Sequence, residues 1–432
     1  MEWQCLKNIF PQEVDSKAET QAKAPPSRKR GRQSIVEGSV KKLKLDFRHN
    51  RGFGHVLTLG QGDTGQLGLG EDILERNKPA HVSSIQDAVD VVAGGMHTAV
   101  LTKTGEVYTF GCNDEGSLGR VVEEEEECFI PGKVSLDGKI VQLSAGDSHT
   151  AALTEDGRVF AWGTFRDSSG PIGLTKNGIQ KTPLRILEGI SIKKISSGSD
   201  HIAALTVSGD VYTLGNAEQG QLGRVPERFS HRGGRRGLDY LLTPDKIHAK
   251  ARSTVFKDVW AGSYNTIVRS TADEILVMGL NNYNQMGLDT GLLFFMPTRS
   301  DSLVASKVDT LVLGQHHTLL ISSSQGAVHA IGRSEYGRLG LGEGAEDAKV
   351  PVPVAELKDM KCVDIACGTA VSFAVTDKGH CYSWGMGTNM QLGHGEDDVL
   401  VPNLIKSKQL ENRSVIAVSS GGQHTVILAK DN

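Results

Sequence analysis

The fold is decided by residues 144–173, which read SAGDSHTAALTEDGRVFAWGTFRDSSGPIG. The first half of this stretch is Gly-x-x-His-Thr, followed by apolar residues and a glycine turn. The second half is an apolar and aromatic run that ends at Gly163. Short runs of this kind on either side of a glycine turn are typical of paired β-strands. We therefore expect strands over 150–154 and 158–162.

Both halves recur along nearly the whole chain. First-half glycines occur at Gly94, Gly146, Gly198, Gly262, Gly314, Gly368 and Gly421. Second-half glycines occur at Gly60, Gly111, Gly163, Gly215, Gly279, Gly332 and Gly385. Successive first-half glycines are 52, 52, 64, 52, 54 and 53 residues apart. A unit of about 40–50 residues matches one four-stranded propeller blade.

The two ends of the repeat are out of phase, because the chain enters with a second half (55–68) and leaves with a first half (413–428). An open solenoid would leave both halves incomplete and would need polar caps, whereas a ring can join them. We therefore predict an all-β, seven-bladed β-propeller over 52–432, with four-stranded blades and one blade shared between the N- and C-terminal segments. A Trp-Asp type of propeller is disfavoured, since its signatures do not recur in register.

Residues 1–51 are predicted to form a disordered basic tail, because they are rich in charge and lack sustained periodicity. The formal net charge is +8 over residues 23–51, −2 over residues 1–22 and −10 over residues 52–432, which together give the −4 of the whole chain. Two basic clusters in the tail are typical of a nuclear localisation signal or a phosphate-contacting arm. Their members are Arg28, Lys29, Arg30, Arg32, Lys41, Lys42 and Lys44.

Composition excludes several classes of protein. The six cysteines form no paired framework and no C-x-x-C motif, which favours a reducing compartment. A metal site at Cys362, Cys367, His380 and Cys381 is disfavoured, because small thiols at strand positions are usually buried. We expect neither a signal peptide nor a membrane-spanning helix, because residues 1–10 carry charges without an apolar core and no apolar run reaches transmembrane length. The phosphate-cradling G-x-x-x-x-G-K-[ST] motif is also missing, and we expect no cofactor.

Two segments depart from the repeat. The second-half glycine is followed by another glycine after 8 residues in six copies, but after 10 residues in the third copy, from Gly163 to Gly173. Enlarged loops on a rigid scaffold usually carry function. The interval between Gly198 and Gly262 holds an arginine-rich insertion, whose guanidinium groups suit carboxylates or phosphates.

The positions after the first-half glycine separate architecture from function. A histidine recurs at the third position in five of seven copies, so we interpret it as a side chain that bonds a neighbouring strand. At the first two positions only Asp147, Asp200 and His316 are ionisable. Because these three occupy equivalent points of different blades, we expect them on one face of the ring and interpret them as functional.

The repeat consensus G-x-x-H-T-x-x-L-T…G-x-V-Y-x-x-G-x-N-x-x-G-Q-L-G resembles the regulator of chromosome condensation family. The stretches at 112–116, 146–149, 221–227, 333–344 and 421–424 carry the likeness, which extends over 55–430. The resemblance implies a guanine nucleotide exchange factor for the small GTPase Ran, bound to nucleosomes and DNA in the nucleus and recognised by importin. It also implies a Ran-GTP gradient that serves nuclear transport and spindle assembly.

The resemblance implies three sets of functional residues. Exchange residues on the Ran face are Asp63, His97, Asp147, Asp200, Arg224, His316 and His424. The wedge at the nucleotide site of the GTPase is Thr164, Phe165, Arg166, Asp167, Ser168, Ser169, Gly170, Pro171 and Ile172. The loop that docks on the acidic patch of the nucleosome contains Arg232, Arg235 and Arg236.

Three other functions are weighed against nucleotide exchange. A pure interaction scaffold would lack the enlarged loop and the singular charged residues on one face. A ubiquitin ligase would require a further catalytic domain. A photoreceptor like the plant ultraviolet-B receptor relies on clustered tryptophans, whereas Trp3, Trp162, Trp260 and Trp384 are far apart in this sequence.

Overall fold

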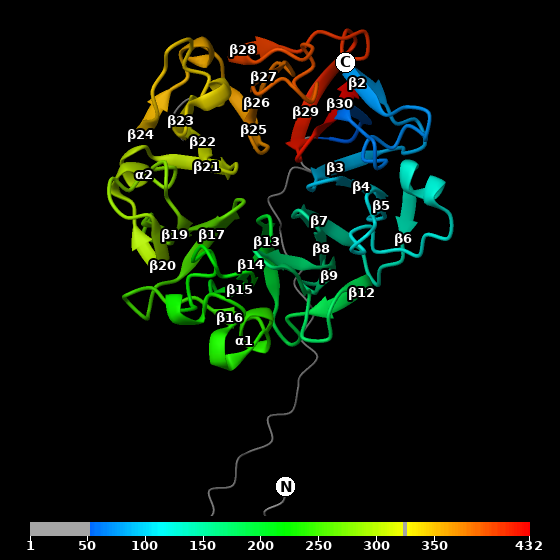
Figure 1. The fold of residues 1–432 in the computed structure, drawn as a ribbon. Helices are drawn as coiled ribbons and strands as arrows, with labels where there is room; N and C mark the ends of the chain where they lie inside the picture. Colours follow the sequence, from blue (N-terminus) through cyan, green and yellow to red (C-terminus); the bar gives the residue numbers. More distant parts are fainter. Residues whose placement is uncertain (1–51, 323–325) are drawn as a thin grey trace, which may run out of the picture. The chain divides into compact units, whose positions relative to one another are not determined.

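The computed structural model describes residues 52–322 and 326–432. The predicted tail, with its two basic clusters, lies outside these residues. Seven four-stranded antiparallel sheets surround a central opening (Figure 1). The predicted seven-bladed β-propeller is therefore confirmed.

The blades are numbered here in chain order from the first complete one. Blade 1 contains β3 (Ala88–Ala93), β4 (His97–Thr102), β5 (Val107–Gly111) and β6 (Gly132–Val134). Blade 2 contains β7 (Ile140–Ala145), β8 (His149–Thr154), β9 (Val159–Gly163) and β12 (Gln180–Ile186). Blade 3 contains β13 (Ile192–Ser197), β14 (His201–Thr206), β15 (Val211–Gly215) and the short β16 (Asp245–Lys246).

The remaining blades follow the same order. Blade 4 contains β17 (Phe256–Ala261), β18 (Asn265–Ser270), β19 (Ile275–Leu280) and β20 (Leu293–Arg299). Blade 5 contains β21 (Val308–Leu313), β22 (His317–Ser322), β23 (Val328–Gly332) and β24 (Ala348–Pro353). Blade 6 contains β25 (Cys362–Cys367), β26 (Val371–Thr376), β27 (Cys381–Gly385) and β28 (Val399–Leu404).

Blade 7 closes the ring with strands from both ends of the repeat. Its order is β2 (Glu75–His81), β1 (His55–Gln61), β30 (His424–Asp431) and β29 (Arg413–Ser420). β1 pairs with β30 in continuous register from His55 opposite Ala429 to Gly60 opposite His424. The predicted shared blade is therefore confirmed.

Helices are short and lie between strands. They are α1 (Asp239–Leu242), α2 (Asp301–Ala305) and the 3-10 turns η2 (Glu125–Phe129), η3 (Glu227–Phe229), η4 (Gly234–Arg236), η5 (Glu335–Gly337) and η6 (Ala355–Leu357). Within the described part of the chain, no helix is long and apolar enough to cross a membrane.

The core lies between neighbouring blades. The second strand of a blade, such as β8, is buried along its whole length, because the two faces of a blade pack against its two neighbours. Trp162 is fully buried between blades 1 and 2, and its Nε1 donates to the Ser117 carbonyl oxygen at 2.7 Å. Gly119, at φ +67°, has no room for a side chain, since a Cβ there would lie 2.6 Å from the same indole.

The repeated histidines join adjacent blades. In four of the seven copies the buried Nε2 lies 2.8–2.9 Å from a hydroxyl oxygen of the following blade. We call each of these histidine–hydroxyl contacts between adjacent blades a latch. The four latches join His97 to Thr150, His201 to Thr266, His317 to Ser372 and His424 to Thr98. The prediction that the histidines bond neighbouring strands is confirmed at these four positions.

Candidate functional site

One rim of the ring carries two kinds of loop, because the strands of each blade alternate in direction. These loops join the first strand to the second, and the third strand to the fourth. Loops of the first kind contact one another around the channel mouth: Gly95 N–H donates to the Gly146 carbonyl oxygen at 3.2 Å, and Asp147 N–H donates to the Ser199 carbonyl oxygen at 2.8 Å. All the predicted functional loops therefore belong to the same rim.

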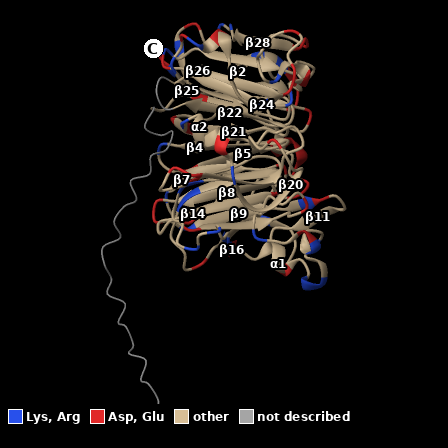
Figure 2. Cartoon of the chain, turned by 90° about the vertical axis from the view of Figure 1, so that its left-hand side faces the viewer, with Lys and Arg blue, Asp and Glu red and all other residues tan. Residues whose placement is uncertain are grey.

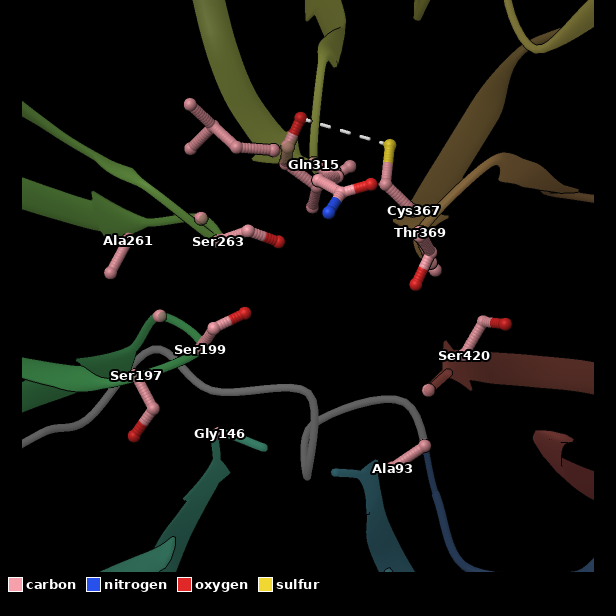
Figure 3. A pocket seen from close by; sticks show the side chains of 18 of the residues that line it. Ala93, Gly146, Ser197, Ser199, Ala261, Ser263, Gln315, Cys367, Thr369 and Ser420 are labelled. Atoms are coloured by element: carbon pink, nitrogen blue, oxygen red, sulfur yellow. Dashed lines mark hydrogen bonds between the residues drawn. The ribbon is translucent and has the colours of Figure 1, made fainter. Parts of the chain in front are cut away.

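The channel itself is narrow and polar. Its cavity of about 270 Å³ is lined by small residues from every blade, including Ser199, Ser263 and Thr369 (Figure 3). Cys367 faces it, and its Sγ lies 3.9 Å from the Val312 carbonyl oxygen. No group of three or more His, Cys, Asp or Glu side chains among residues 52–322 and 326–432 is arranged to hold a metal ion.

Asp147 and Asp200 form an acidic pair at the channel mouth. Burial and the charge of Asp147 raise the pKa of Asp200 to about 7, against the opposing effect of a hydrogen bond from the Arg166 amide. Asp147 is exposed to solvent at the channel mouth, but the surrounding loops desolvate its carboxyl enough to raise the pKa of that group as well, against the opposing effect of the Ser199 hydroxyl. The charge of Asp147 thus disfavours the ionised form of Asp200, which stores electrostatic strain at this point of the rim.

The enlarged loop beside this pair is a two-stranded hairpin of β10 (Phe165–Asp167) and β11 (Gly170–Gly173). Thr164 and Phe165 at its base are fully buried, and the Phe165 ring packs edge-on against His149 with centroids 4.8 Å apart. Arg166, Ser168, Ser169 and Pro171 are exposed. The aromatic residue therefore anchors the hairpin, and the polar tip is the part that a partner can reach.

Blade 3 holds the backbone of the hairpin. Asp200 Oδ1 accepts the Arg166 amide at 2.7 Å, and Asn216 Nδ2 donates to the Arg166 carbonyl oxygen at 2.8 Å. Glu218 accepts both the Ser168 amide at 3.0 Å and the Ser168 hydroxyl at 2.7 Å. The hairpin is therefore an ordered projection that is bonded to the neighbouring blade.

Two contacts of the hairpin side chains come from further loops. The Arg166 guanidinium pairs with Glu115 of the blade 1 loop. Asp167 pairs with Arg232 of the arginine-rich insertion, with the Arg232 Nε 2.8 Å from Oδ2. The hairpin thus connects loops from three successive blades.

His316 lies apart from the acidic pair, since blade 4 separates its loop from that of Asp200. Its ring packs near Tyr283, with centroids 5.1 Å apart, and Arg333 lies over Tyr283 at 4.7 Å. Burial, followed by the charges of Arg338 and Arg333, lowers the pKa of His316 to about 4. The expectation of a shared rim is met, but His316 is a neutral imidazole in an aromatic and basic cluster.

Three of the other predicted exchange residues hold the structure together. His97 and His424 are buried latches, and burial lowers their pKa to about 4 and about 3. Arg224 is half-buried and donates to carbonyl oxygens of Tyr240, Leu241 and Thr243, which fixes α1. A role for these three in exchange would be to hold the ring and its loops. Asp63 is exposed on the rim, and its Oδ1 accepts from Gln66.

The arginine-rich insertion forms η3, η4 and α1 on the same side as the hairpin. Basic residues gather near α1 and β11 in Figure 2. Arg235 and Arg236 are exposed and stack on the Phe229 ring at 5.8 and 5.1 Å, and Arg236 also lies 4.5 Å from the Tyr240 ring. Neither guanidinium has a carboxylate within ion-pair distance among the described residues. Arg232 differs, because its guanidinium already forms an ion pair with Asp167.

The sequence prediction missed Glu115, Asn216 and Glu218, which bond the hairpin. Glu218 lies at a position where other blades also carry an acidic residue, such as Asp63, so it is hard to distinguish from its equivalents. Asn216 directly follows Gly215, and no other copy has an asparagine there, which is a signal that the comparison of copies could have used. The position of both residues one blade after the enlarged loop is a further signal.

A ring of seven such blades with this rim defines an RCC1-like domain, and the chain matches that family over residues 55–427. The chain therefore belongs to the RCC1-like domain family, and among its members it is similar to proteins named regulator of chromosome condensation. It is 50% identical over 420 residues to the one from Mus musculus, which spans 94% of this chain and 99% of the relative.

Two yeast comparisons extend the likeness. The guanine nucleotide exchange factor SRM1 of Saccharomyces cerevisiae is 30% identical over 433 residues, covering 86% of each chain. The crystal structure of Prp20p from the same organism, described with its binding properties to Gsp1p and histones, superposes with a TM-score of 0.79. That structure is 28% identical in sequence and covers 90% of this chain and 94% of its own.

Proposed function

We propose that this chain is a guanine nucleotide exchange factor that promotes release of GDP and GTP from the nuclear small GTPase Ran while bound to nucleosomes. The observation that carries the proposal is the hairpin of blade 2, which stands on the rim beside Asp147 and Asp200 and is bonded to blade 3. A relative named as a guanine nucleotide exchange factor supports it.

Exchange requires no covalent chemistry. An exchange factor binds its GTPase most tightly when nucleotide is absent, and the coupling is reciprocal, so it weakens nucleotide binding by the same factor. The ring supplies a rigid platform, since each blade is bonded to the next. The exposed tip of the hairpin occupies space near the nucleotide, and the rim charges hold the displaced segments of the GTPase.

The acidic pair has a defined part in this scheme. Asp200 already accepts the Arg166 amide, so we assign it to the support of the hairpin as well as to the rim charge. Asp147 is exposed and is free to contact a basic side chain of the GTPase. His316 supplies a neutral hydrogen-bonding group two blades beyond Asp200.

The direct test is stopped-flow release of labelled GDP from Ran, with other small GTPases as specificity controls. We expect the wild-type chain to accelerate release from Ran alone, and both Asp200→Ala and deletion of residues 165–171 to slow it. If both variants release GDP at the wild-type rate, the assignment of the site is wrong.

Nucleosome docking is assigned to Arg235 and Arg236, whose guanidinium groups are exposed and lack a carboxylate partner among the described residues. Guanidinium groups suit the carboxylates of an acidic histone surface, and histone binding is named for the similar Prp20p. The Arg235→Ala, Arg236→Ala double variant is expected to bind nucleosomes more weakly and to release GDP at the wild-type rate. Unchanged nucleosome binding would remove this assignment.

The predicted tail is proposed to contact DNA and importin and to direct the protein to the nucleus. Its basic clusters neutralise phosphates or fit an acidic receptor groove. A fusion of residues 23–51 to a fluorescent reporter should accumulate in nuclei. Replacement of both clusters by alanine should abolish that accumulation, and persistence of the signal would contradict the proposal.

A further inference from the structure

The contact between the hairpin and the arginine-rich insertion joins two surfaces with different proposed partners. Arg232 approaches Asp167 with two nitrogens: Nε lies 2.8 Å from Oδ2, and Nη2 donates to Oδ1 at 2.9 Å. The Nη2–Oδ1 contact is a hydrogen bond, and the Nε–Oδ2 contact is an ion-pair distance, so the guanidinium lies directly beside the carboxylate. The two residues are 65 positions apart in the sequence, so the ring alone brings them together.

The burial of the two side chains is unequal. The Asp167 side chain is 3% exposed, whereas that of Arg232 is 45% exposed. An exposed ion pair contributes little to stability, but removing the partner of a buried carboxylate leaves a charge without compensation. The Asp167 carboxylate therefore depends on Arg232 for the compensation of its charge.

Asp167 also organises the tip of the hairpin. Its Oδ1 accepts the Ser169 amide at 2.8 Å, which closes the turn between β10 and β11. The carboxylate that Arg232 neutralises is thus the same group that shapes the exposed tip. A shift of Asp167 toward water would move Ser168 and Ser169.

The insertion adopts an unfavourable backbone conformation at this point. Arg232 has φ +45°, which non-glycine residues seldom adopt. Such conformations persist where the surroundings over-determine them, often at functional sites. The preceding residue, His231, adds a second contact, with its Nδ1 3.1 Å from Glu218 Oε1, and Glu218 itself accepts from Ser168.

We propose that Arg232 is a positioning residue of the hairpin, which it clamps through Asp167, and that it is not a docking residue for an acidic partner. The inference rests on the proposed exchange function and assigns Arg232 a different role from Arg235 and Arg236. It replaces the sequence prediction, which placed all three arginines in one docking loop. Arg232 acts on the GTPase only through the hairpin.

The matched control is Arg228. It belongs to the same insertion, is exposed, and stacks on the Phe229 ring at 4.8 Å. Among the described residues it has no ion-pair partner. Arg228→Ala therefore removes the same charge from the same loop without touching the hairpin.

Nucleotide release from Ran is measured over a range of exchange-factor concentrations. For Arg232→Ala we expect the limiting release rate to fall by about tenfold, equivalent to about 1.4 kcal/mol. The concentration that gives half of this rate should change little, because the platform is intact. Arg228→Ala should match wild type, and Arg232→Lys, which keeps one contact, should recover part of the rate.

Amide hydrogen exchange of the isolated chain provides a second measurement. The Ser169 amide, which donates to Asp167, should exchange about tenfold faster in Arg232→Ala than in Arg228→Ala. Equal rates in the two variants, for both GDP release and amide exchange, would overturn the clamp. If the wild-type chain does not accelerate nucleotide release from Ran, the proposed function fails. Amide exchange still decides whether Arg232 holds the hairpin.

Discussion

Replacing Asp200 by asparagine should stabilise the protein at pH 8 and leave its stability nearly unchanged at pH 4. The pKa of Asp200 in the folded chain is about 7, against an ordinary value of 3.8, because of burial and the charge of Asp147. Below about pH 4 the carboxyl is protonated in both folded and unfolded chains, so it costs nothing. Between pH 4 and 7 the folded chain keeps a proton that the unfolded chain releases, and the cost grows as the pH rises.

The magnitude follows from the size of this shift. A shift of about 3 pKa units corresponds to at most about 4 kcal/mol at pH 8. The asparagine side chain is isosteric, and its Oδ1 can still accept the Arg166 amide, so we expect a gain of about 2–4 kcal/mol in the free energy of unfolding. The protein thus trades stability for a charge on the rim, as functional sites often do.

The assay is denaturant unfolding of wild type and Asp200→Asn at pH 8 and at pH 4, with Asp63→Asn as control. Asp63 is exposed on the same rim, and its replacement should change the free energy of unfolding by less than about 0.5 kcal/mol. An equal gain at both pH values, or no gain at pH 8, would refute the reasoning that the ionised carboxylate is strained in the fold.

Three further changes test other parts of the structure. Thr150→Val removes the hydroxyl that bonds His97 and should lower the free energy of unfolding by about 1–3 kcal/mol. The control in the same denaturation assay is Ile202→Val, at the equivalent position of the next blade, where no latch exists. Equal losses in the two variants would contradict the latch. Met390→Gly should raise the thermal midpoint, because Met390 has φ +60°, a conformation that costs a non-glycine residue about 1–2 kcal/mol; an unchanged or lower midpoint would argue against that strain. Arg224→Met removes the donors to the carbonyl oxygens around α1 and should make the insertion the first site of limited proteolysis, whereas a wild-type cleavage pattern would show that Arg224 does not hold it.

Most of the fold could be predicted from the sequence. The spacing of the glycines and the out-of-phase ends required a closed ring of seven units, because an incomplete half at each end leaves strands without partners. The same comparison of copies singled out the enlarged loop and the residues Asp147, Asp200 and His316. Repetition made these departures visible, since every other blade served as a reference.

The contacts between blades could not be predicted in the same way. The sequence predicted His97 and His424 both as architectural and as exchange residues, and only their burial shows that they reach the next blade instead of the rim surface. The resemblance implies that Phe165 is part of the wedge, whereas the structure places its side chain beneath the hairpin as an anchor. A repeat pattern shows which positions are equivalent, but it does not show how far each side chain extends.

The sequence by itself determined the number of blades, the closure of the ring and the loops that differ from the rest. Only the tertiary structure decided that Asp200 bonds the Arg166 amide and that Arg232 meets Asp167. The physical reason is that strand periodicity and turns depend on residues close together in the chain. Pairing between loops of neighbouring blades depends instead on how the ring curves, which all seven interfaces set together.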